Sequence, residues 1–402
     1  MTRLSRLIFG NFWTVVALGG ALGEWTLACW FLGAPASWAL HALAIVSLTA
    51  VNRLAAEAYD RERHTAPVLQ AVGGVMLAAG FVAAAGAAAL GVTAAGWYAV
   101  STLTALPAQA DALQAPVGVR FGAPFDALAG LVVLVTMAVA TWGYTHGHRR
   151  LRVTQLDVPM ADLPPELDGL RIVHITDLHL GPTAHRDSLR EALDQVNALE
   201  PDLICVTGDV IDSRSTDLEH WVPELSRLRA RHGVFAVLGN HDAYAGSDRV
   251  AAALRASTSW RLLRDEVATL EIDGARLHLI GLEDHRAPRS AAILLDLRAE
   301  VRAGEPCMLL VHQPALFPAA ARLSVPLTLA GHTHGGQVAL PGVPVVNTAR
   351  ILMTRFDAGT FACGDAVLHV NMGLGTSGQR VRIAAPREIT VVKLLAPIAV
   401  AA

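Results

Sequence analysis

The hydrophobic and polar positions of this chain follow two different patterns, and the change comes near residue 150. Before that point, long apolar runs alternate with short polar segments that carry most of the charges. A helix crosses the core of a bilayer with about 20 apolar residues. The first part is therefore predicted to be an all-α transmembrane bundle over residues 1–150, with spans at Ile8–Leu32, Trp38–Val51, Val68–Val92 and Ala127–Tyr144.

The number of spans stays open between four and five. Trp38–Val51 is short and needs Leu54 and Ala55 to reach the required length, while Thr93–Leu106 is either a fifth span or an interfacial segment. The positive-inside rule favours four, because all arginine-rich ends then lie on the cytoplasmic face of a bacterial-type inner membrane, together with both termini. Those ends carry Arg3, Arg6, Arg53, Arg61, Arg63, Arg149, Arg150 and Arg152.

Two polar features stand out in or beside the predicted spans. Glu24 lies inside the first span, where acids are often functional. A protonated Glu24, or one bonded to a neighbouring group of the bundle, is the simpler interpretation. His146 and His148 follow the last span and resemble a metal-binding tract, but a solvated turn at the membrane exit is the simpler interpretation there.

From Val153 onward, short apolar runs alternate with segments of helical periodicity, such as Ser188–Leu199 and Leu218–Leu228. Crossovers of this length predict an α/β domain over residues 151–402 in which many strands are parallel. The predicted strands are Ile172–Ile175, Leu203–Val206, Val234–Leu238, Val267–Ile272, Arg276–Leu282, Met308–Val311, Leu327–Leu329, Leu368–Val370 and Ile389–Leu394, with a hairpin turn at Asp273-Gly274.

Composition supports this division and excludes some classes of function. A chain of 402 residues with a mean hydropathy of +0.41 and 17% charged residues is too apolar for a wholly soluble protein. A net charge of −3 and a pI near 6.6 argue against a general nucleic-acid binder. The cysteines are far apart and are predicted to be free buried thiols: Cys29, Cys205, Cys307 and Cys363.

Residues that can bind metal ions follow five of the predicted strands. A single Asp-x-His triplet would be weak evidence, but the same event recurs after each of these strands. Because polar groups at the carboxyl ends of parallel strands gather at one edge of the sheet, the recurrence predicts one composite site. The residues are Asp177, His179, Asp209, Asp212, Asn240, His241, Asp242, His312, His332 and His334.

The donor types predict which ions this site would bind and what they would do. Imidazole, carboxylate and amide donors without thiolate favour Mn, Fe, Zn or Co, and two ions need roughly seven or eight such ligands with one bridging carboxylate. Two ions about 3.5–4 Å apart stabilise both the attacking and the departing oxygen of a phosphoryl displacement. The sequence therefore predicts two divalent metal ions, Mn²⁺ foremost, and phosphate-ester chemistry.

The order of these motifs resembles that of the calcineurin-like metallophosphoesterase superfamily over about Val153 to Leu395. The motifs are Asp-x-His, Gly-Asp-x-x-Asp, Gly-Asn-His-Asp, a lone His and Gly-His-Thr-His. The segments 312–314, 331–337, 373–378 and 386–389 further resemble bacterial membrane-anchored phosphoesterases akin to UDP-2,3-diacylglucosamine hydrolases. The resemblance implies a four-layer α/β-β/α sandwich.

The resemblance also implies a role for each residue of the site. His241 would face the substrate as an acid or phosphate-binding group, Asp242 would orient its ring, and Asp212 would support the ligands from behind. The metal ligands would be Asp177, His179 and His334 for one ion and Asn240, His312 and His332 for the other, with Asp209 as the bridge.

The sequence therefore predicts a membrane-anchored dimetal phosphoesterase with its catalytic domain in the cytoplasm. Its substrates would be phosphodiesters or pyrophosphates, with a lipid or a nucleotide-linked lipid as the candidate carrier, and its partner would be the lipid bilayer. Two alternatives stay open: a phosphomonoesterase or protein phosphatase, and a membrane sensor with a structural metal site. An intact His241-Asp242 pair argues against the sensor, because a structural metal site needs no acid beside it.

Overall fold

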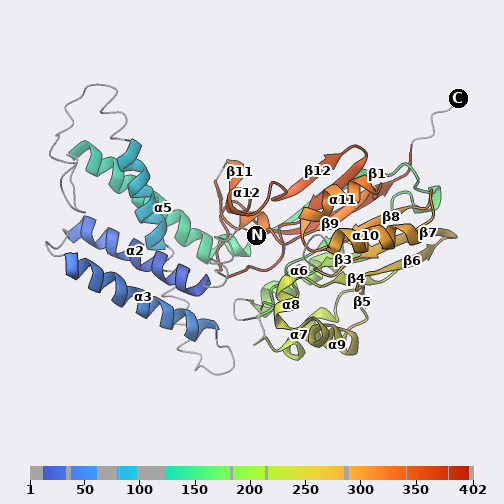
Figure 1. Ribbon diagram of the computed structural model, residues 1–402, viewed down its shortest axis with the longest axis horizontal. Coiled ribbons are helices and arrows are strands. Elements are labelled where there is room, and N and C mark those ends of the chain that lie inside the picture. Colours follow the sequence, from blue (N-terminus) through green and yellow to red (C-terminus); the bar gives the residue numbers. More distant parts are fainter. Residues whose placement is uncertain are drawn as a thin grey trace. The chain divides into compact units, whose positions relative to one another are not determined.

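The computed structural model of this chain describes residues 12–32, 38–60, 79–80, 82–96, 123–181, 184–212, 216–284, 289–340, 342–378 and 380–397. The chain divides into two compact units, Met1–Thr145 and His146–Ala402. The first consists of helices and the second of mixed α and β structure (Figure 1).

The described part of the first unit consists of helices that lie at all four predicted spans. They are α2 (Phe12–Leu32), α3 (Trp38–Asp60), the helix Val82–Gly96 and α5 (Ala123–Thr145). Among the described residues, the helical stretch Ala127–Arg149 has the length and mean hydropathy, 1.8, of a membrane span. A bundle of several spans therefore stays a prediction, and most of the undecided segment, residues 97–106, lies outside the described residues.

The interior of this first unit gives Glu24 a partner. The amide of Asn52 on α3 lies 3.3 Å from Glu24 Oε2 and is itself buried. Glu24 thus bonds to a neighbouring helix, as the simpler interpretation expected, although the sequence did not identify its partner. The helices also approach closely, since a Cβ on Gly23 would lie 2.4 Å from Ala84 Cα.

The second unit is built on two six-stranded sheets. The first sheet has the order β1 (Leu151–Pro159), β14 (Arg387–Leu395), β2 (Arg171–Ile175), β3 (Leu203–Thr207), β4 (Val234–Val237) and β5 (Arg261–Leu262). The second has the order β12 (Gly359–Cys363), β13 (Ala366–Val370), β9 (Leu327–Ala330), β8 (Cys307–Leu310), β7 (Ala275–Gly281) and β6 (Glu266–Ile272). A small hairpin, β10 (Ala339–Leu340) and β11 (Val343–Asn347), stands apart.

Both sheets are mixed, with parallel strands at their centres. Strands β2 to β5 run parallel, and β14 pairs antiparallel with β2 and parallel with β1. In the other sheet, β7, β8, β9 and β13 are parallel while β6 and β12 join antiparallel. The strands that the sequence linked to metal-binding groups, β2, β3, β4, β8 and β9, are all in the parallel parts.

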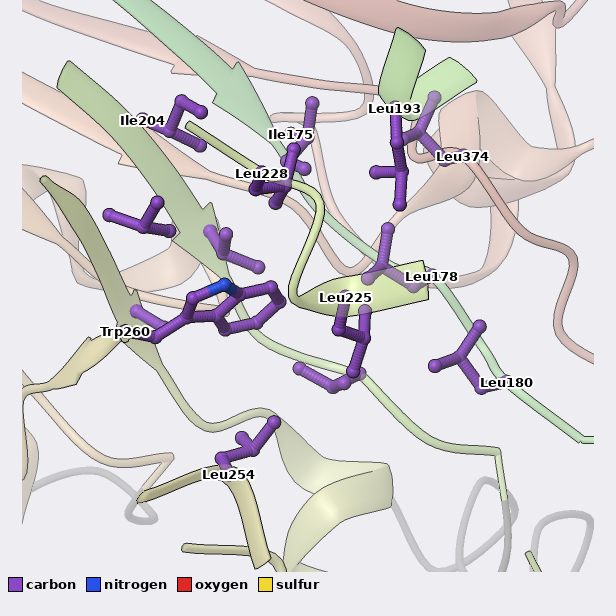
Figure 2. Close-up of a cluster of buried hydrophobic side chains, with 14 of the residues drawn as sticks. Ile175, Leu178, Leu180, Leu193, Ile204, Leu225, Leu228, Leu254, Trp260 and Leu374 are labelled. Atoms are coloured by element: carbon purple, nitrogen blue, oxygen red, sulfur yellow. The ribbon is translucent and has the colours of Figure 1, made fainter. Parts of the chain in front are cut away.

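The central strands are continuously apolar in sequence because each sheet is buried on both faces. Along β3, Leu203 and Cys205 face the core between the sheets, while Ile204 and Val206 face the core beneath the helices. In Figure 2, leucines from the covering helices surround Ile175 and Ile204 of the first sheet.

Helices cover the outer face of each sheet. The first sheet shares a hydrophobic core with α6 (Arg186–Ala198), α7 (Leu218–Leu225) and α9 (Ser247–Ser257). The second sheet shares another core with α10 (Arg289–Glu300) and α11 (Phe317–Arg322). The predicted four-layer α/β-β/α sandwich is thus present. The shorter helices are η2 (Gly147–Arg149), η3 (Pro165–Leu167), α8 (Asn240–Ala245), η4 (Pro314–Leu316), η5 (His334–Gly336) and α12 (Thr348–Leu352).

The structure differs from the predictions in the unpredicted strands β1, β5, β10, β11 and β12 and in the burial of two residues. Strand β1 was missed because, as an exposed edge strand, it is rich in polar residues rather than continuously apolar. Cys363 is free but exposed, whereas the other three cysteines are free and buried as predicted. His146 is exposed, as a solvated turn requires, but His148 is buried, so the turn interpretation is wrong for that residue.

Candidate metal centre

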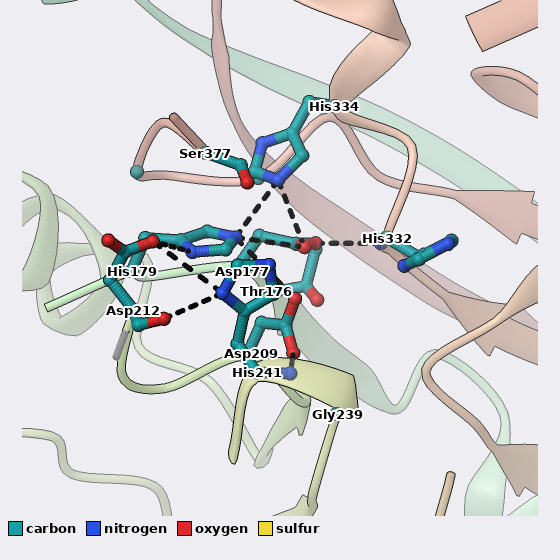
Figure 3. Close-up of polar contacts among 12 residues, drawn as sticks. Thr176, Asp177, His179, Asp209, Asp212, Gly239, His241, His332, His334 and Ser377 are labelled. Atoms are coloured by element: carbon teal, nitrogen blue, oxygen red, sulfur yellow. Dashed lines mark hydrogen bonds and ion pairs between the residues drawn. The ribbon is translucent and has the colours of Figure 1, made fainter. Parts of the chain in front are cut away.

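The predicted ligands come together where the two sheets present the carboxyl ends of their parallel strands. Among the described residues, three groups have ligand atoms close enough to hold an ion, and one of them, His179, Asp212 and His241, shares His179 with another. The other two consist of predicted metal ligands. One contains Asp177, His179 and His334, and the other Asp209, His312 and His332. Figure 3 shows Asp177, His179, Asp209 and His334 gathered at the loops that follow the strands.

The loops that carry the ligands adopt an unusual backbone conformation. Left-handed φ values are uncommon outside glycine, and when they cluster they mark sites whose geometry the surrounding fold imposes. Such sharp turns direct each side chain back toward the common centre. The ligands concerned are Asp177 (φ 51°), His179 (43°), Asp209 (50°), His332 (73°) and His334 (54°).

Close approach of the loops requires a glycine at position 331. A Cβ there would lie 2.3 Å from Asp177 Oδ2 and 2.2 Å from Thr176 Oγ1, which is impossible. The absence of a side chain lets the backbone N–H of His332 donate to Asp177 Oδ2 at 2.9 Å. The loop after β9 is thereby fixed against the loop after β2.

In the first ligand group, the distances between donor atoms suit a shared ion. His179 Nε2 lies 3.0 Å from His334 Nε2, and Asp177 Oδ1 lies 3.3 Å from His334 Nε2 and 3.7 Å from His179 Nε2. Asp177 Oδ1 is buried and accepts no hydrogen bond from the described residues. Such an orphaned carboxylate oxygen between two imidazoles fits a cation.

The second ligand group includes Asn240 as predicted. His312 Nε2 lies 3.1 Å from Asn240 Oδ1 and 3.2 Å from His332 Nδ1. The backbone carbonyl of Thr207 lies 2.8 Å from His312 Nδ1, so this nitrogen donates and Nε2 keeps its lone pair for an ion.

Asp209 stands between the two groups. Its Oδ2 lies 3.5 Å from His179 Nε2 of the first group and 3.2 Å from His312 Nε2 of the second. Its Oδ1 accepts the backbone N–H of His241 at 2.8 Å, which holds the carboxylate in place. This position suits a bridging ligand, and the donor set as a whole fits two divalent ions without thiolate.

The carboxylates create a strongly negative environment at the centre. Burial acts to lower the pKa of His179 and of His312, but the nearby carboxylates of Asp177, Asp212 and Asp209 raise the pKa of His179 to about 10. Asp209 and Asp177 likewise raise the pKa of His312 to about 10. Buried carboxylates that stabilise cationic imidazoles so strongly would also stabilise metal ions.

His241 borders this centre and is partly exposed. Its Nδ1 lies 2.7 Å from the backbone carbonyl of Asp212, and its ring stands edge-on to His179 with centroids 4.7 Å apart. About a quarter of its side chain is accessible. Since Nδ1 donates to the carbonyl, Nε2 is the nitrogen that can meet a substrate.

The role predicted for Asp242 requires a correction, because its carboxylate does not contact the His241 ring. It accepts the backbone N–H groups of Gly239, Val210 and Ile211 at 2.9, 3.2 and 3.1 Å and is fully buried. Asp242 therefore ties the loop after β3 to the start of α8. The aspartate beside His241 is Asp212, which also lies 3.0 Å from His179 Nδ1.

Sequence reasoning missed a buried cation behind the first ligand group. Arg382 is only 1% exposed, bonds to backbone carbonyls of Met372, Gly373 and Gly375, and reaches within 3.3 Å of His334 Nδ1. The segment between 373 and 386 contains two arginines, Arg380 and Arg382, and the sequence does not distinguish them. The importance of Arg382 depends on burial, which the sequence does not display.

Comparison with known proteins agrees with this geometry. A family model described as calcineurin-like phosphoesterase matches residues 170–336, which contain all seven predicted metal ligands. The chain carries a calcineurin-like phosphoesterase domain. The match begins at the start of β2 and ends at the turn that bears His334.

Curated relatives of this phosphoesterase domain occur in animals and bacteria. A Bos taurus transmembrane protein with metallophosphoesterase domain is 32% identical over 65% of this chain and 61% of its own length. An uncharacterized metallophosphoesterase of Campylobacter jejuni is 34% identical over 62% of this chain and 66% of its own length. Another, YkuE of Bacillus subtilis, is 29% identical over 66% of this chain and 96% of its own length. The chain thus spans somewhat less than two thirds of the first two relatives.

Proposed function

We propose that this protein is a metal-dependent phosphoric ester hydrolase that acts at a membrane. The observation that carries the proposal is the pair of ligand groups joined by Asp209, with Asp177 Oδ1 buried between two imidazoles and without a hydrogen-bond donor among the described residues. The phosphodiester or pyrophosphate bond is the proposed target.

Two sets of residues would each hold one metal ion. Asp177, His179 and His334 would hold one ion and Asn240, His312 and His332 the other, with Asp209 shared. When bound, the ions, Mn²⁺ foremost with Fe, Zn or Co as alternatives, would polarise the phosphoryl oxygens and lower the pKa of a water molecule.

His241 would protonate the departing oxygen. Its Nδ1 is held by the Asp212 carbonyl, which leaves Nε2 facing the open side of the centre. Its partial exposure supports catalysis over a purely structural metal site, because a structural site would be closed around its ions.

Two observations support the membrane as partner. The helical stretch Ala127–Arg149 has the composition of a span and leads directly into the phosphoesterase domain. Within that domain, the hairpin β10–β11 and helix α12 expose large apolar side chains, among them Ile351 at 69% and Leu352 at 77%. An exposed apolar patch of this kind is suited to a lipid surface, and the similarity to a named transmembrane protein agrees with it.

A substrate panel tests the proposed reaction. Full-length protein, purified in detergent and loaded with Mn²⁺, is assayed on phosphodiesters, phosphomonoesters and lipid pyrophosphates. Preference for diesters or pyrophosphates is expected, and preference for monoesters would favour a phosphatase. Binding of two ions with no turnover of any ester would favour the sensor. The UDP-2,3-diacylglucosamine hydrolase resemblance stays a prediction that the same panel addresses.

Reporter fusions test the proposed cytoplasmic location. A fusion after residue 116 and one at the C-terminus should report opposite sides of the membrane, because the arginine-rich ends gather on one face. If both fusions report the same side, the four-span arrangement is wrong.

A further inference from the structure

A hollow, partly open to solvent, lies against the candidate metal centre inside the phosphoesterase unit. His179 belongs both to its lining and to the first ligand group. The hollow is therefore one imidazole ring away from the proposed ions. Nothing in the proposed roles of the metal ligands or of His241 uses this space.

The lining of the hollow is cationic on an apolar floor. Two arginines, Arg380 and Arg387, and three histidines, His148, His179 and His185, line it, and the described lining contains no carboxylate. This accumulation is unusual in a chain of net charge −3. The floor consists of leucines of the main core, which exclude water and so strengthen electrostatic attraction: Leu178, Leu180, Leu189 and Leu374.

Arg387 has a free donor at this place. The residue is 4% exposed, with Nε donating to the Leu374 carbonyl at 3.0 Å and Nη2 to the Ser188 carbonyl at 2.6 Å. Its Nη1 is buried and has no acceptor among the described residues. A buried cationic nitrogen without an acceptor is costly, and an anion in the hollow would supply the missing partner.

The start of helix α6 adds further donors. The helix has 13 residues and begins at Arg186, its N-cap residue His185 makes no capping bond with its side chain, and Ser188 of its first turn lines the hollow. The first N–H groups of a helix have no partner inside the helix and favour anions. At the rim, Arg380 contacts His185, which places a second guanidinium beside this helix start.

We propose that this hollow is an anion subsite that holds a second, uncleaved phosphate of the substrate while the metal centre acts on the first. The inference rests on the proposed hydrolase function and narrows its substrate class to compounds with two phosphate groups. The doubly anionic oxygens of a phosphate match a guanidinium nitrogen and helix N–H groups better than a neutral headgroup does.

Alkane bisphosphonates with one to four methylene groups probe this subsite, with methylphosphonate as the single-anion reference. Each is measured as an inhibitor of bis(p-nitrophenyl) phosphate hydrolysis by the full-length protein in constant excess Mn²⁺, which offsets chelation. At least one bisphosphonate should inhibit about tenfold more tightly than methylphosphonate, as one added charge-assisted contact implies. No advantage at any spacer length would overturn the subsite.

Substitutions in the lining of the hollow test whether the tighter inhibition by bisphosphonates arises there. Arg380→Gln at the rim and Arg387→Lys in the wall should each reduce the bisphosphonate advantage over methylphosphonate several-fold, while Arg322→Gln on α11, outside the lining, should keep it. Because Arg387 also bonds to the backbone, metal content and the thermal midpoint are measured alongside. A variant of Arg380 that keeps both the fold and the full advantage would contradict the proposal.

Two further measurements are needed. One distinguishes free phosphate from a phosphate of the substrate as the bound anion, and the other tests the anion subsite independently of the proposed hydrolase function. If inorganic phosphate inhibits noncompetitively and this inhibition depends on Arg387, the hollow binds free phosphate rather than a part of the substrate, which would overturn the proposal. If the protein hydrolyses no ester, calorimetric titration of the metal-loaded protein with the same bisphosphonates still measures the subsite. Binding that is lost in Arg380→Gln would then support the anion site while the hydrolase proposal failed.

Discussion

Asp212 Oδ1 lies 3.0 Å from Nδ1 of His179, and this contact fixes how the histidine presents its other nitrogen to the metal centre. With the proton on Nδ1 shared with Asp212, Nε2 keeps its lone pair toward Asp177 and Asp209. Carboxylates behind metal-binding histidines commonly have this orienting effect. Asp212 is thus a positioning residue for His179.

Replacing Asp212 by Ala should therefore weaken metal binding without changing the set of ligands. Loss of such an orienting carboxylate typically reduces metal affinity about 10–100-fold. Titration of the metal-free protein with Mn²⁺ measures this, and Asp187→Ala on the exposed side of α6 is the control. Equal Mn²⁺ affinity in the Asp212 and Asp187 variants would remove the positioning role.

The position of Asp209 between the two ligand groups predicts different metal losses in two variants. Asp209→Asn should lose most of both ions, because it removes the charge that both share, whereas His334→Ala should mainly empty one site. Elemental analysis of the purified proteins decides between these outcomes. Two ions per chain in Asp209→Asn would show that the carboxylate does not bridge.

His241→Ala should keep both ions but lose rate in a way that depends on the leaving group. General acid catalysis is worth about 10²–10⁴ in rate when the leaving group is a poor one. Turnover of alkyl phosphodiesters should fall by that factor, and turnover of p-nitrophenyl esters much less. His220→Ala, at an exposed position of α7, serves as the control. Equal losses on both ester types would exclude a general acid.

Asp242→Asn should affect stability more than chemistry. The carboxylate binds three backbone N–H groups, and an amide would oppose one of them with its own donor, at a cost of about 1–3 kcal/mol in unfolding free energy. Urea unfolding measures the loss, with Asp365→Asn in the turn between β12 and β13 as control. A variant that unfolds normally yet has lost turnover would restore the catalytic role first predicted for Asp242.

A buried ion pair far from the metals predicts how stability depends on pH. Hydrogen bonds from Arg190, at 2.9 Å, and from Arg186, at 2.7 Å, lower the pKa of Glu224 on α7, against the opposing effect of burial. The stabilisation is therefore present above the ordinary glutamate pKa and disappears as the pH falls through the lower folded value.

Glu224→Gln reveals this contribution. The variant should be less stable at pH 7 by about 1 kcal/mol, since both arginines are partly solvated, and the two proteins should converge in strong acid. Unfolding free energies measured from pH 7 down to pH 3 test this. A difference that stays constant over this range would mean that the charge of Glu224 is not its cause.

The sequence by itself determined the central strands and the polar residues that meet at the candidate metal centre. Strands such as β3 are buried on both faces and are therefore continuously apolar. Each is followed by a polar residue whose type alone indicates its chemistry. Those signals are local, so no knowledge of distant contacts is needed to find Asp209 or His334. The exposed edge strand β1 lacks such a signal, because polar residues interrupt it and only its pairing with β14, more than 200 residues away, identifies it as a strand.

Only the tertiary structure decided which groups act together. Asp242 follows His241 in the chain, yet its side chain turns into the interior, and Asp212, from another strand end, takes the place beside the imidazole. The buried Arg382 and the unpaired Nη1 of Arg387 are likewise invisible in the sequence. Neighbours along the chain fix only the starting point of a side chain, whereas burial and hydrogen-bond partners arise from segments that folding brings together from far apart.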